Sequence, residues 1–497
     1  FAGSSDTVNV SVNAADTTTT VTVAPDPSVC GQSVTVCATV TTDAPGSGVP
    51  TGTVTFTGPG GLNQTVVLDA NGKACLTTTV LASGTVSAQY NGAACFEVSS
   101  DTVGVTVNPA DTTTTVTVAP DPSVCGELVT VCATVAVNPP GSGVPTGTVT
   151  FTGPGGLNQT VVLDPNGKAC LTTTVLATGT VTATYNGAAC FNASTGTSGV
   201  TVGEASTTTT VTVTPNPSVC GQLVTVCATV TTNAPGSGTP TGTVTFTGGG
   251  GLNVTVVLDV TGKACLATTT AAGGMLTATY NGEGPCFASS TGTATLVVNP
   301  ADTTTTVTAT PDPSACGQSV TVCATVTTNP PGSGVPTGTV TFTGPGGLNQ
   351  TVPLDGTGKA CVATTSLASG TVTARYNGAG CFAASTGTRT VTVNTAATTT
   401  TVTATPNPSV CGQSVTLCAT VAVNPPGSGV PTGTVTFTGP GGLNQTVPLD
   451  ATGKACATST ASVSGTVTAT YNGAGCFAAS TGTRTVTVNP VTTTTTV

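Results

Sequence analysis

Histidine and tryptophan are absent from this chain of 497 residues, methionine occurs once, and only 5% of the residues are charged. Histidine is the commonest general base and the usual partner of a nucleophilic thiol. No pair of acidic residues stands in a plausible catalytic arrangement either, so the sequence predicts no catalytic residues. The sparse charge also argues against an ordinary cytosolic enzyme and against the highly charged profile of disordered chains. We therefore expect no enzymatic activity and no cofactor.

Positively charged residues are especially few. Eight Lys and Arg stand against 18 Asp and Glu, which gives a net charge of −10. Nucleic-acid binding needs a basic stripe, so nucleic acid is excluded as a partner. No apolar run approaches the ~20 residues that cross a bilayer, and no membrane span is expected in this segment. Because residue 1 is Phe, the lack of a secretory signal carries no information.

The chain is, however, strongly periodic. The stretch PSVCGQSVTVCATV at residues 27–40 recurs almost letter for letter four more times. Its first cysteine, Cys30, returns at intervals of 95 or 96 residues as Cys125, Cys220, Cys316 and Cys411. A fixed period of this size indicates an array of domains of one kind. The expected boundaries are residues 15–109, 110–204, 205–300, 301–395 and 396–489 for repeats 1 to 5, with 1–14 as the last strand of a preceding repeat and 490–497 as the first strand of a following one.

Within repeat 1, seven short stretches have strand character. Apolar residues alternate with Thr in several of them, as in half-buried strands. Pro- and Gly-rich segments separate them, and Asn71-Gly72 is typical of a tight turn. No helical period occurs, so the sequence predicts an all-β fold of two-sheet, seven-stranded antiparallel sandwiches. Linkers such as residues 108–110 are too short to be flexible spacers, which predicts a semi-rigid rod of roughly 40 Å per repeat.

Several motifs follow one another in a fixed order: residues 27–40, PTGTVTF at 50–56, Leu68-Asp69 with Gly72-Lys73-Ala74, Gly84-Thr85-Val86, Tyr90-x-Gly92 and Phe96. This ordered set resembles the bacterial Ig-like repeat domains. The resemblance covers the whole chain. It implies tandem Ig-like sandwiches on a cell surface or in an extracellular appendage, which in that family usually act as stalks or adhesive fibres without catalytic residues. The cysteines depart from the family pattern, because positions 30, 37, 75 and 95 are usually aromatic or small polar residues there.

Twenty cysteines, four in each repeat, indicate an oxidising, extracellular compartment. Cys37 and Cys75 lie on the outward phase of the second and fifth strands, which are antiparallel neighbours in an Ig-like sandwich. A cross-strand bridge within each repeat is therefore expected. The cysteines assigned to these intra-repeat bridges are Cys37 with Cys75, Cys132 with Cys170, Cys227 with Cys265, Cys323 with Cys361, and Cys418 with Cys456.

The other two cysteines of each repeat lie in turns at opposite ends of an Ig-like sandwich, too far apart to pair inside it. In a head-to-tail array they would meet those of the neighbouring repeats. The expected inter-repeat bridges are Cys30–Cys190, Cys125–Cys286, Cys220–Cys381 and Cys316–Cys476, with Cys95 and Cys411 pairing outside this segment. Three alternatives stay open: closure of all four cysteines within each repeat, a zinc site of four thiolates despite unsuitable spacing, and a catalytic thiol that lacks any His partner.

Each repeat also carries an Asn-x-Thr sequon, a candidate glycosylation signal. The five acceptor residues are Asn63, Asn158, Asn253, Asn349 and Asn444. The Lys that follows each Asn-Gly-type turn, such as Lys73, is expected to form a solvated surface pair with the Asp four positions before it.

Two functions are compatible with these features. The first is an extracellular fibre or stalk whose partners are further copies of the same repeat or chain. The second is an adhesin or glycan-binding array that contacts a surface or glycan ligand. The second would be favoured by an aromatic platform on the loops, for which only residues of the Tyr90 and Phe96 types are available.

Overall fold

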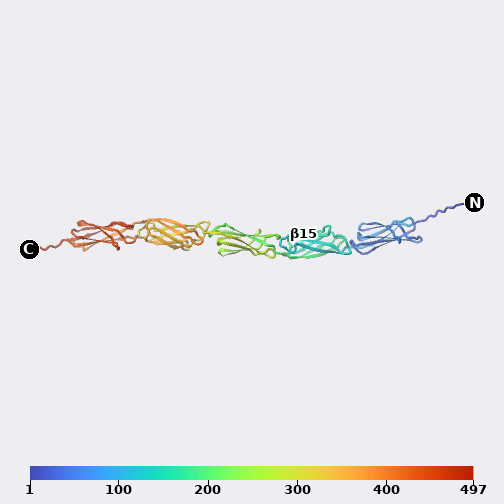
Figure 1. Ribbon diagram of the computed structural model, residues 1–497, viewed down its shortest axis with the longest axis horizontal. Helices are drawn as coiled ribbons and strands as arrows, with labels where there is room; N and C mark the ends of the chain where they lie inside the picture. Colours follow the sequence, from blue (N-terminus) through green and yellow to red (C-terminus); the bar gives the residue numbers. More distant parts are fainter. Residues whose placement is uncertain (496–497) are drawn as a thin grey trace.

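The structure is a computed structural model that describes residues 1–495. Its regular structure in this range is β-strand, apart from two three-residue 3-10 turns, η1 (Gly249–Gly251) and η2 (Pro440–Gly442). Five β-sandwiches follow one another in a row, with repeats 1 and 5 at opposite ends of a thin rod (Figure 1). The predicted all-β tandem array is confirmed. None of the helical segments between residues 1 and 495 is long and apolar enough to cross a membrane.

Each sandwich consists of a three-stranded and a four-stranded antiparallel sheet, with a short parallel pair at one end. In repeat 1 the sheet orders are β1-β3-β6 and β5-β4-β7-β8, and β2 pairs with β9. The strands are β1 (Thr17–Ala24), β2 (Ser28–Val29), β3 (Val34–Thr42), β4 (Thr53–Gly58), β5 (Leu62–Val67), β6 (Lys73–Thr78), β7 (Gly84–Tyr90), β8 (Ser99–Val105) and β9 (Val107–Asn108).

The other four repeats have the same strand order. Repeat 2 contains β10 (Thr112–Ala119), β11 (Ser123–Val124), β12 (Val129–Val137), β13 (Thr148–Gly153), β14 (Leu157–Val162), β15 (Lys168–Thr173), β16 (Gly179–Tyr185), β17 (Ser194–Val200) and β18 (Val202–Gly203). Repeat 3 contains β19 (Thr207–Thr214), β20 (Ser218–Val219), β21 (Val224–Thr232), β22 (Thr243–Gly248), β23 (Leu252–Val257), β24 (Lys263–Thr268), β25 (Gly274–Tyr280), β26 (Ser290–Leu296) and β27 (Val298–Asn299). Repeat 4 contains β28 (Thr303–Thr310), β29 (Ser314–Ala315), β30 (Val320–Thr328), β31 (Thr339–Gly344), β32 (Leu348–Pro353), β33 (Lys359–Thr364), β34 (Gly370–Tyr376), β35 (Ser385–Val391) and β36 (Val393–Asn394). Repeat 5 contains β37 (Thr398–Thr405), β38 (Ser409–Val410), β39 (Ser414–Val423), β40 (Thr434–Gly439), β41 (Leu443–Pro448), β42 (Lys454–Thr460), β43 (Gly465–Tyr471), β44 (Ser480–Val486) and β45 (Val488–Asn489).

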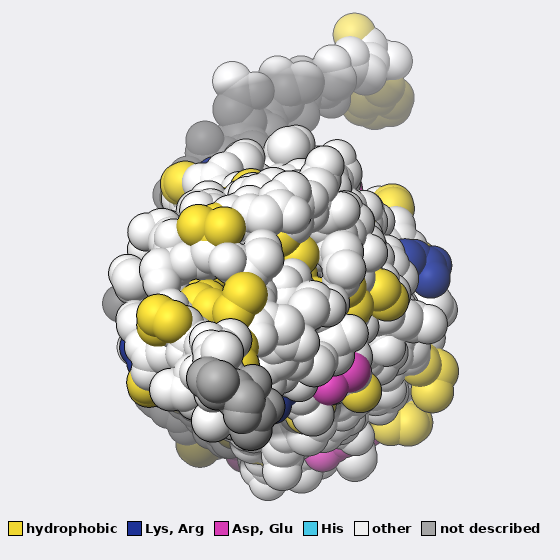
Figure 2. All heavy atoms as spheres, turned by 90° about the vertical axis from the view of Figure 1, so that its left-hand side faces the viewer, with side chains coloured by type: hydrophobic (Ala, Val, Ile, Leu, Met, Phe, Trp, Pro, Cys, Tyr) yellow, Lys and Arg dark blue, Asp and Glu magenta, His cyan; other side chains and the backbone are white. Residues whose placement is uncertain are grey.

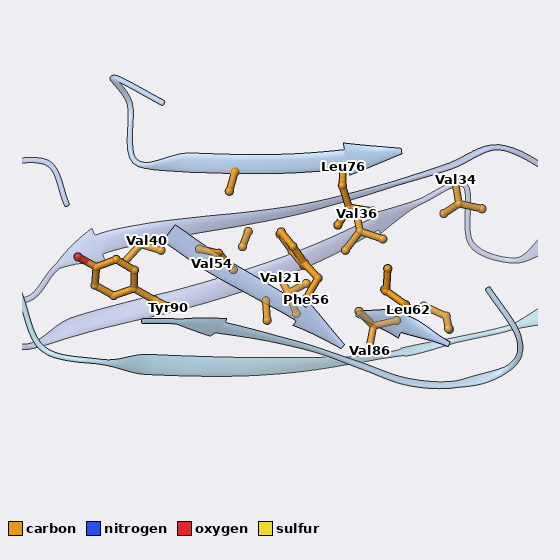
Figure 3. Close-up of a cluster of buried hydrophobic side chains, with 14 of the residues drawn as sticks. Val21, Val34, Val36, Val40, Val54, Phe56, Leu62, Leu76, Val86 and Tyr90 are labelled. Carbon is orange, nitrogen blue, oxygen red and sulfur yellow. The ribbon is translucent and has the colours of Figure 1, made fainter. Parts of the chain in front are cut away.

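The core of each sandwich is built by alternation along the strands. In β3, Val36 and Ala38 are buried, whereas Thr35 and Thr39 point outward, because successive side chains of a strand face opposite sides. Small Val and Ala side chains pack around one Phe and one Tyr, as Phe56 and Tyr90 show in Figure 3. The hydroxyl of each core Tyr donates to a backbone carbonyl, in repeat 1 that of Thr51 at 2.6 Å. A buried polar atom is thereby satisfied.

The first and last long strands of each repeat lie side by side and run in the same direction. At one end Ala15 and Phe96 form a parallel bridge, and at the other β2 pairs in parallel with β9. Between these points the hydroxyl of Ser99 lies 2.7 Å from the hydroxyls of both Thr17 and Thr19. Both strands therefore cross the whole length of the repeat, from one end to the other.

The turn before β6 is held by hydrogen bonds from the backbone to the Asp side chain. The Asp69 carboxylate accepts the backbone N–H groups of Asn71 and Lys73, each at 2.8 Å, and these hydrogen bonds hold its pKa below the usual value. Asp69 and Lys73 form no salt bridge, and the ion pair present among residues 1–495 joins Arg389 to Asp312. The backbone is the better partner because a tight turn points its N–H groups at the Asp side chain.

The two terminal segments form no strand in the described range. Residues 1–14 and 490–495 carry no strand assignment, and residues 496–497, part of the predicted strand of a following repeat, lie outside the described residues. Their assignment to neighbouring repeats stays a prediction.

Candidate functional site

The feature that distinguishes this array is the junction between successive repeats. At junction 1 the carbonyl of Asn108 accepts the N–H of Cys30, and the N–H of Ala110 donates to the carbonyl of Cys190, each at 2.9 Å. Asn108 is thus fixed to repeat 1 and Ala110 to repeat 2, which leaves Pro109 as the only residue between them. The same two hydrogen bonds recur at all four junctions, with single intervening residues Pro109, Glu204, Pro300 and Thr395.

A tight turn at the far end of repeat 1 presents Cys30. The N–H of Gln32 donates to the carbonyl of Val29 at 2.9 Å, and the Gln32 side chain accepts the N–H of Val29 at 3.0 Å. Gly31 takes up the positive φ of +73° that this turn requires. Cys30 therefore lies at the tip of a turn that is closed by its own hydrogen bonds.

A second turn presents Cys190 from the near end of repeat 2. The backbone groups of Ala188 and Phe191 exchange two hydrogen bonds, both 3.0 Å long, and close a small hairpin with Cys190 at its tip. Since Ala110 pairs with Phe191 in parallel, this tip lies beside the point where the linker enters repeat 2.

The two tips meet across the junction. The Cα atoms of Cys30 and Cys190 are 5.7 Å apart, and the equivalent pairs Cys125–Cys286, Cys220–Cys381 and Cys316–Cys476 are separated by 5.3, 5.7 and 5.7 Å. These distances lie in the usual range for a disulfide, about 4.4–6.8 Å. Cys95 and Cys411, which have no neighbouring repeat in the described part of the chain, are exposed and unpaired there.

The remaining cysteines form disulfides inside the repeats. Cys37 lies opposite Cys75 in the register of β3 and β6, with Cα atoms 4.1 Å apart, and the equivalent pairs of the other repeats have the same separation. The neighbours Val36 and Ala38 point into the core, so this bridge lies on the outer face of the three-stranded sheet.

A serine that the sequence did not single out also holds each junction. The N–H of Ser142 in repeat 2 donates to the carbonyl of Cys30 at 3.3 Å, and its hydroxyl donates to the carbonyl of Gly31 at 2.5 Å. Ser237, Ser333 and Ser428 make the same two contacts at the other junctions. The signal was present in the sequence, because the Pro-Gly-Ser-Gly segment varies little between repeats, but nothing local indicated its partner.

Contact with the next repeat changes the surroundings of the cysteine turn. Cys30 and Cys125 are buried, with 9% and 8% of their surface exposed, whereas Cys411, at the same position but without a following repeat, is exposed. The neighbouring repeat therefore adds to the burial of these cysteines, and Cys220 and Cys316, at the same position in repeats 3 and 4, are partly buried.

Other predicted surface features are placed as follows. The acceptor residues Asn63, Asn158, Asn253, Asn349 and Asn444 are exposed on the edge strands β5, β14, β23, β32 and β41. Tyr90 is fully buried and Phe96 packs partly against the core, so neither forms an exposed aromatic platform. Residues 1–495 contain no cluster of three potential metal ligands from His, Cys, Asp and Glu. The end-on view shows mainly uncharged polar surface, with scattered apolar and isolated charged groups (Figure 2).

The fold and the junctions together define a tandem array of β-sandwiches with closely apposed ends. The pattern of the bacterial Ig-like domain (group 3) family matches residues 20–108, 116–203, 307–394 and 402–489, so the chain belongs to this family. Repeat 3 is not matched but has the same sheet order as the others. No curated protein matches the chain in sequence.

Solved structures with similar arrays share little sequence with the chain. A tetra-tandem repeat in the extending region of a large adhesion protein is 19% identical, with a TM-score of 0.37, over 77% of this chain and 100% of that one. Sidekick-1 immunoglobulin domains 1–5 are 13% identical, with a TM-score of 0.25, over 97% and 100%. The Escherichia coli adhesin FdeC is 18% identical, with a TM-score of 0.21, over 58% and 99%.

Proposed function

We propose that the chain is a non-enzymatic extracellular fibre or stalk in which disulfides join each Ig-like repeat to the next. The observation that carries this proposal is the fourfold apposition of two cysteines beside a one-residue linker, with Cα separations of 5.3–5.7 Å. A protein that must keep neighbouring domains in line gains from such junctions, because a second connection beside the linker limits bending and twisting.

An oxidising compartment is needed for these bridges. Each one forms when two thiols give up two electrons and two protons to an oxidant, such as the disulfide of a thiol oxidoreductase. Twenty cysteines in one chain fit an extracellular location, where such bonds persist. The proposed domain boundaries agree with this arrangement, since at each of the four junctions one repeat ends and the next begins beside an apposed cysteine pair.

The partners we propose are further copies of the same repeat or chain, joined end to end. The alternative of a glycan-binding array loses its aromatic platform, because Tyr90 is buried and Phe96 is partly covered. N-glycosylation at Asn63 and its four equivalents stays a proposal, supported by their exposure on edge strands. Intact mass of the native protein tests it directly.

The test combines location with shape. Antibody against the repeats should label intact cells without permeabilisation, and negatively stained oxidised chains should be straight rods of roughly 200 Å. The variant C30S/C190S should widen the distribution of angles at junction 1, whereas the matched control C37S/C75S, which removes a bridge inside repeat 1, should not. Labelling that requires permeabilised cells, or equal angle distributions for both variants, would contradict the proposal.

A further inference from the structure

The first and last strands of a repeat both run from its near end to its far end, which is the direction in which a pulling force acts on the rod. From Ala15 to Cys30 the chain crosses repeat 1 from its near end to its far end, and from Cys95 to Asn108 it crosses in the same direction. The five strands between them, β3 to β7, form the rest of the sandwich. Every repeat thus contains two parallel segments that run from end to end, which we call crossings, and between them the strands β3 to β7 or their equivalents, which we call the body.

At each junction the two crossings change roles: the last strand of one repeat leads into the first strand of the next, and the first strand leads into the last. The last strand of repeat 1 continues through Pro109 into the first strand of repeat 2. The first strand of repeat 1 ends at Cys30, whose partner Cys190 immediately precedes the last strand of repeat 2. Each crossing therefore has a covalent continuation into the next repeat, one through a peptide bond and the other through a disulfide.

We infer that this connectivity makes the chain a double covalent cable, in which two routes carry tension past the folded bodies of the repeats. The inference rests on the inter-repeat disulfides of the proposed function. Route A passes from Cys30 to Cys190, along the chain to Cys220, and through the next bridge to Cys381 and on to Cys411. Route B passes from Cys95 to Cys125, and through its bridges along Cys286–Cys316 to Cys476.

Each route can lengthen by only about 20 Å per two repeats before it is fully extended. Each peptide segment between bridges, such as Cys190 to Cys220, contains one last strand and one first strand and advances the chain by two repeats. Its 30-residue separation spans about 100 Å at full extension, against roughly 80 Å for two folded repeats. A pulling force therefore meets a taut covalent path before it can extract β3 to β7.

The two routes shorten the covalent path from one end of the five repeats to the other, and either route alone is sufficient. At either end of the five repeats one body must still be crossed, through its Cys37–Cys75-type bridge, to reach the outermost strand. The shortest covalent path from Ala15 to Asn489 then contains about 115 residues, or about 400 Å when stretched. With only the intra-repeat bridges the path would contain about 285 residues and reach about 1,000 Å.

Single-molecule pulling of the whole chain, held at its two ends, tests the inference after the bridges have been mapped in the same preparation. The oxidised chain should reach a contour length of about 400 Å between Ala15 and Asn489, and the fully reduced chain about 1,650 Å. Stepwise unfolding of the bodies of repeats 2 to 4 during pulling of a chain with mapped inter-repeat bridges would overturn the double cable but leave the stalk proposal standing. Absence of the bridges from the map would instead overturn the proposed junctions themselves.

Variants separate the two routes. The variant C30S/C190S interrupts route A only, so the oxidised contour length should stay at about 400 Å because route B is intact. Adding C125S/C286S interrupts route B at the next junction, and the length should rise to about 700 Å. The control C227S/C265S removes a bridge from a body that neither route crosses, and should leave the length unchanged. A longer chain after C30S/C190S alone, or no change after the fourfold substitution, would contradict the two-route arrangement.

Discussion

At the scale of the residue, one glycine in each cysteine turn allows the repeats to meet. Gly31 has a φ of +73°, and a Cβ atom placed on it would overlap the backbone carbonyl of Ser142 in the next repeat. Gly412 has the same role in repeat 5 with a φ of +82°, but no atom lies within 4 Å of such a Cβ. The two positions therefore share a left-handed backbone and differ in the neighbouring repeat, although the Gly412 N–H also donates to the carbonyl of Ala461 at 2.8 Å.

The substitution Gly31→Ala should loosen junction 1, whereas Gly412→Ala should affect no junction. Both variants carry the cost of a left-handed alanine, about 1–2 kcal/mol, but only the first also pushes Ser142 away. We expect faster hydrogen exchange at the Ser142 amide in Gly31→Ala and up to two additional titratable thiols per chain, as Cys30 and Cys190 fail to pair. Equal exchange and thiol counts in the two variants would show that the glycine is needed only for its turn.

The buried tyrosines make a second prediction at this scale. Tyr185→Phe removes the hydrogen bond from the hydroxyl to the carbonyl of Thr146, 2.7 Å long, and leaves that carbonyl unpaired. The free energy of opening of repeat 2 should fall by about 1–3 kcal/mol. Native-state hydrogen exchange of β16 measures the change, with the exposed position Thr117→Val as the control. An effect no larger than that of the control would mean that water replaces the lost partner.

At the scale of the element, the turn before the sixth strand of each sandwich depends on an ionised carboxylate. In Asp69 and Asp164 the pKa is lowered chiefly by a backbone N–H, that of Lys73 and Lys168, respectively. In Asp259, Asp355 and Asp450 the largest cause is the hydroxyl of the Thr two residues later. The five turns therefore respond to acid in the same direction.

Stability should fall as the pH drops through the lowered pKa values of these groups. The carboxyl groups have their ordinary pKa, 3.8, in the unfolded chain and a lower one in the folded chain, so on acidification the unfolded chain binds protons first. The stabilisation is complete above about pH 5 and is lost below pH 3.8. Thermal unfolding of the wild type between pH 2 and 6 should show this loss, and the variant with all five Asp replaced by Asn should show a shallower one. Parallel pH profiles would assign the acid sensitivity to other carboxyl groups.

Most elements could be predicted from the sequence because they alternate. In the strand that contains Val34, Val36 and Ala38, the alternating apolar side chains are sufficient to identify the buried face. The buried face of β8 is less evident from the sequence, because Ser99, which lies beside the hydroxyls of two threonines, replaces an apolar residue there. Ser142 could not be assigned to the junction for a related reason, since its partners lie 111 residues away in another repeat.

At the scale of the whole molecule, the ends of the repeats matter more than their faces. The surface has few charges, and its exposed apolar side chains are scattered. The junctions, by contrast, repeat the same linker length, the same serine contacts and the same apposed cysteines four times. An array whose junctions are all alike in this way is suited to hold many repeats in line over a long distance, as we propose for this stalk.

Peptide mapping without reduction identifies which cysteines are joined to one another. The sequences around Cys30 (PDPSVCGQS) and Cys190 (NGAACFNAS) are each unique in the chain, so the linked peptides can be told apart from those of the other repeats. We expect the peptide containing Cys30 to be recovered joined to the peptide containing Cys190, and Cys37 to be joined to Cys75. Recovery of Cys30 joined to Cys95 of its own repeat, or as a free thiol in the freshly isolated protein, would contradict this pairing.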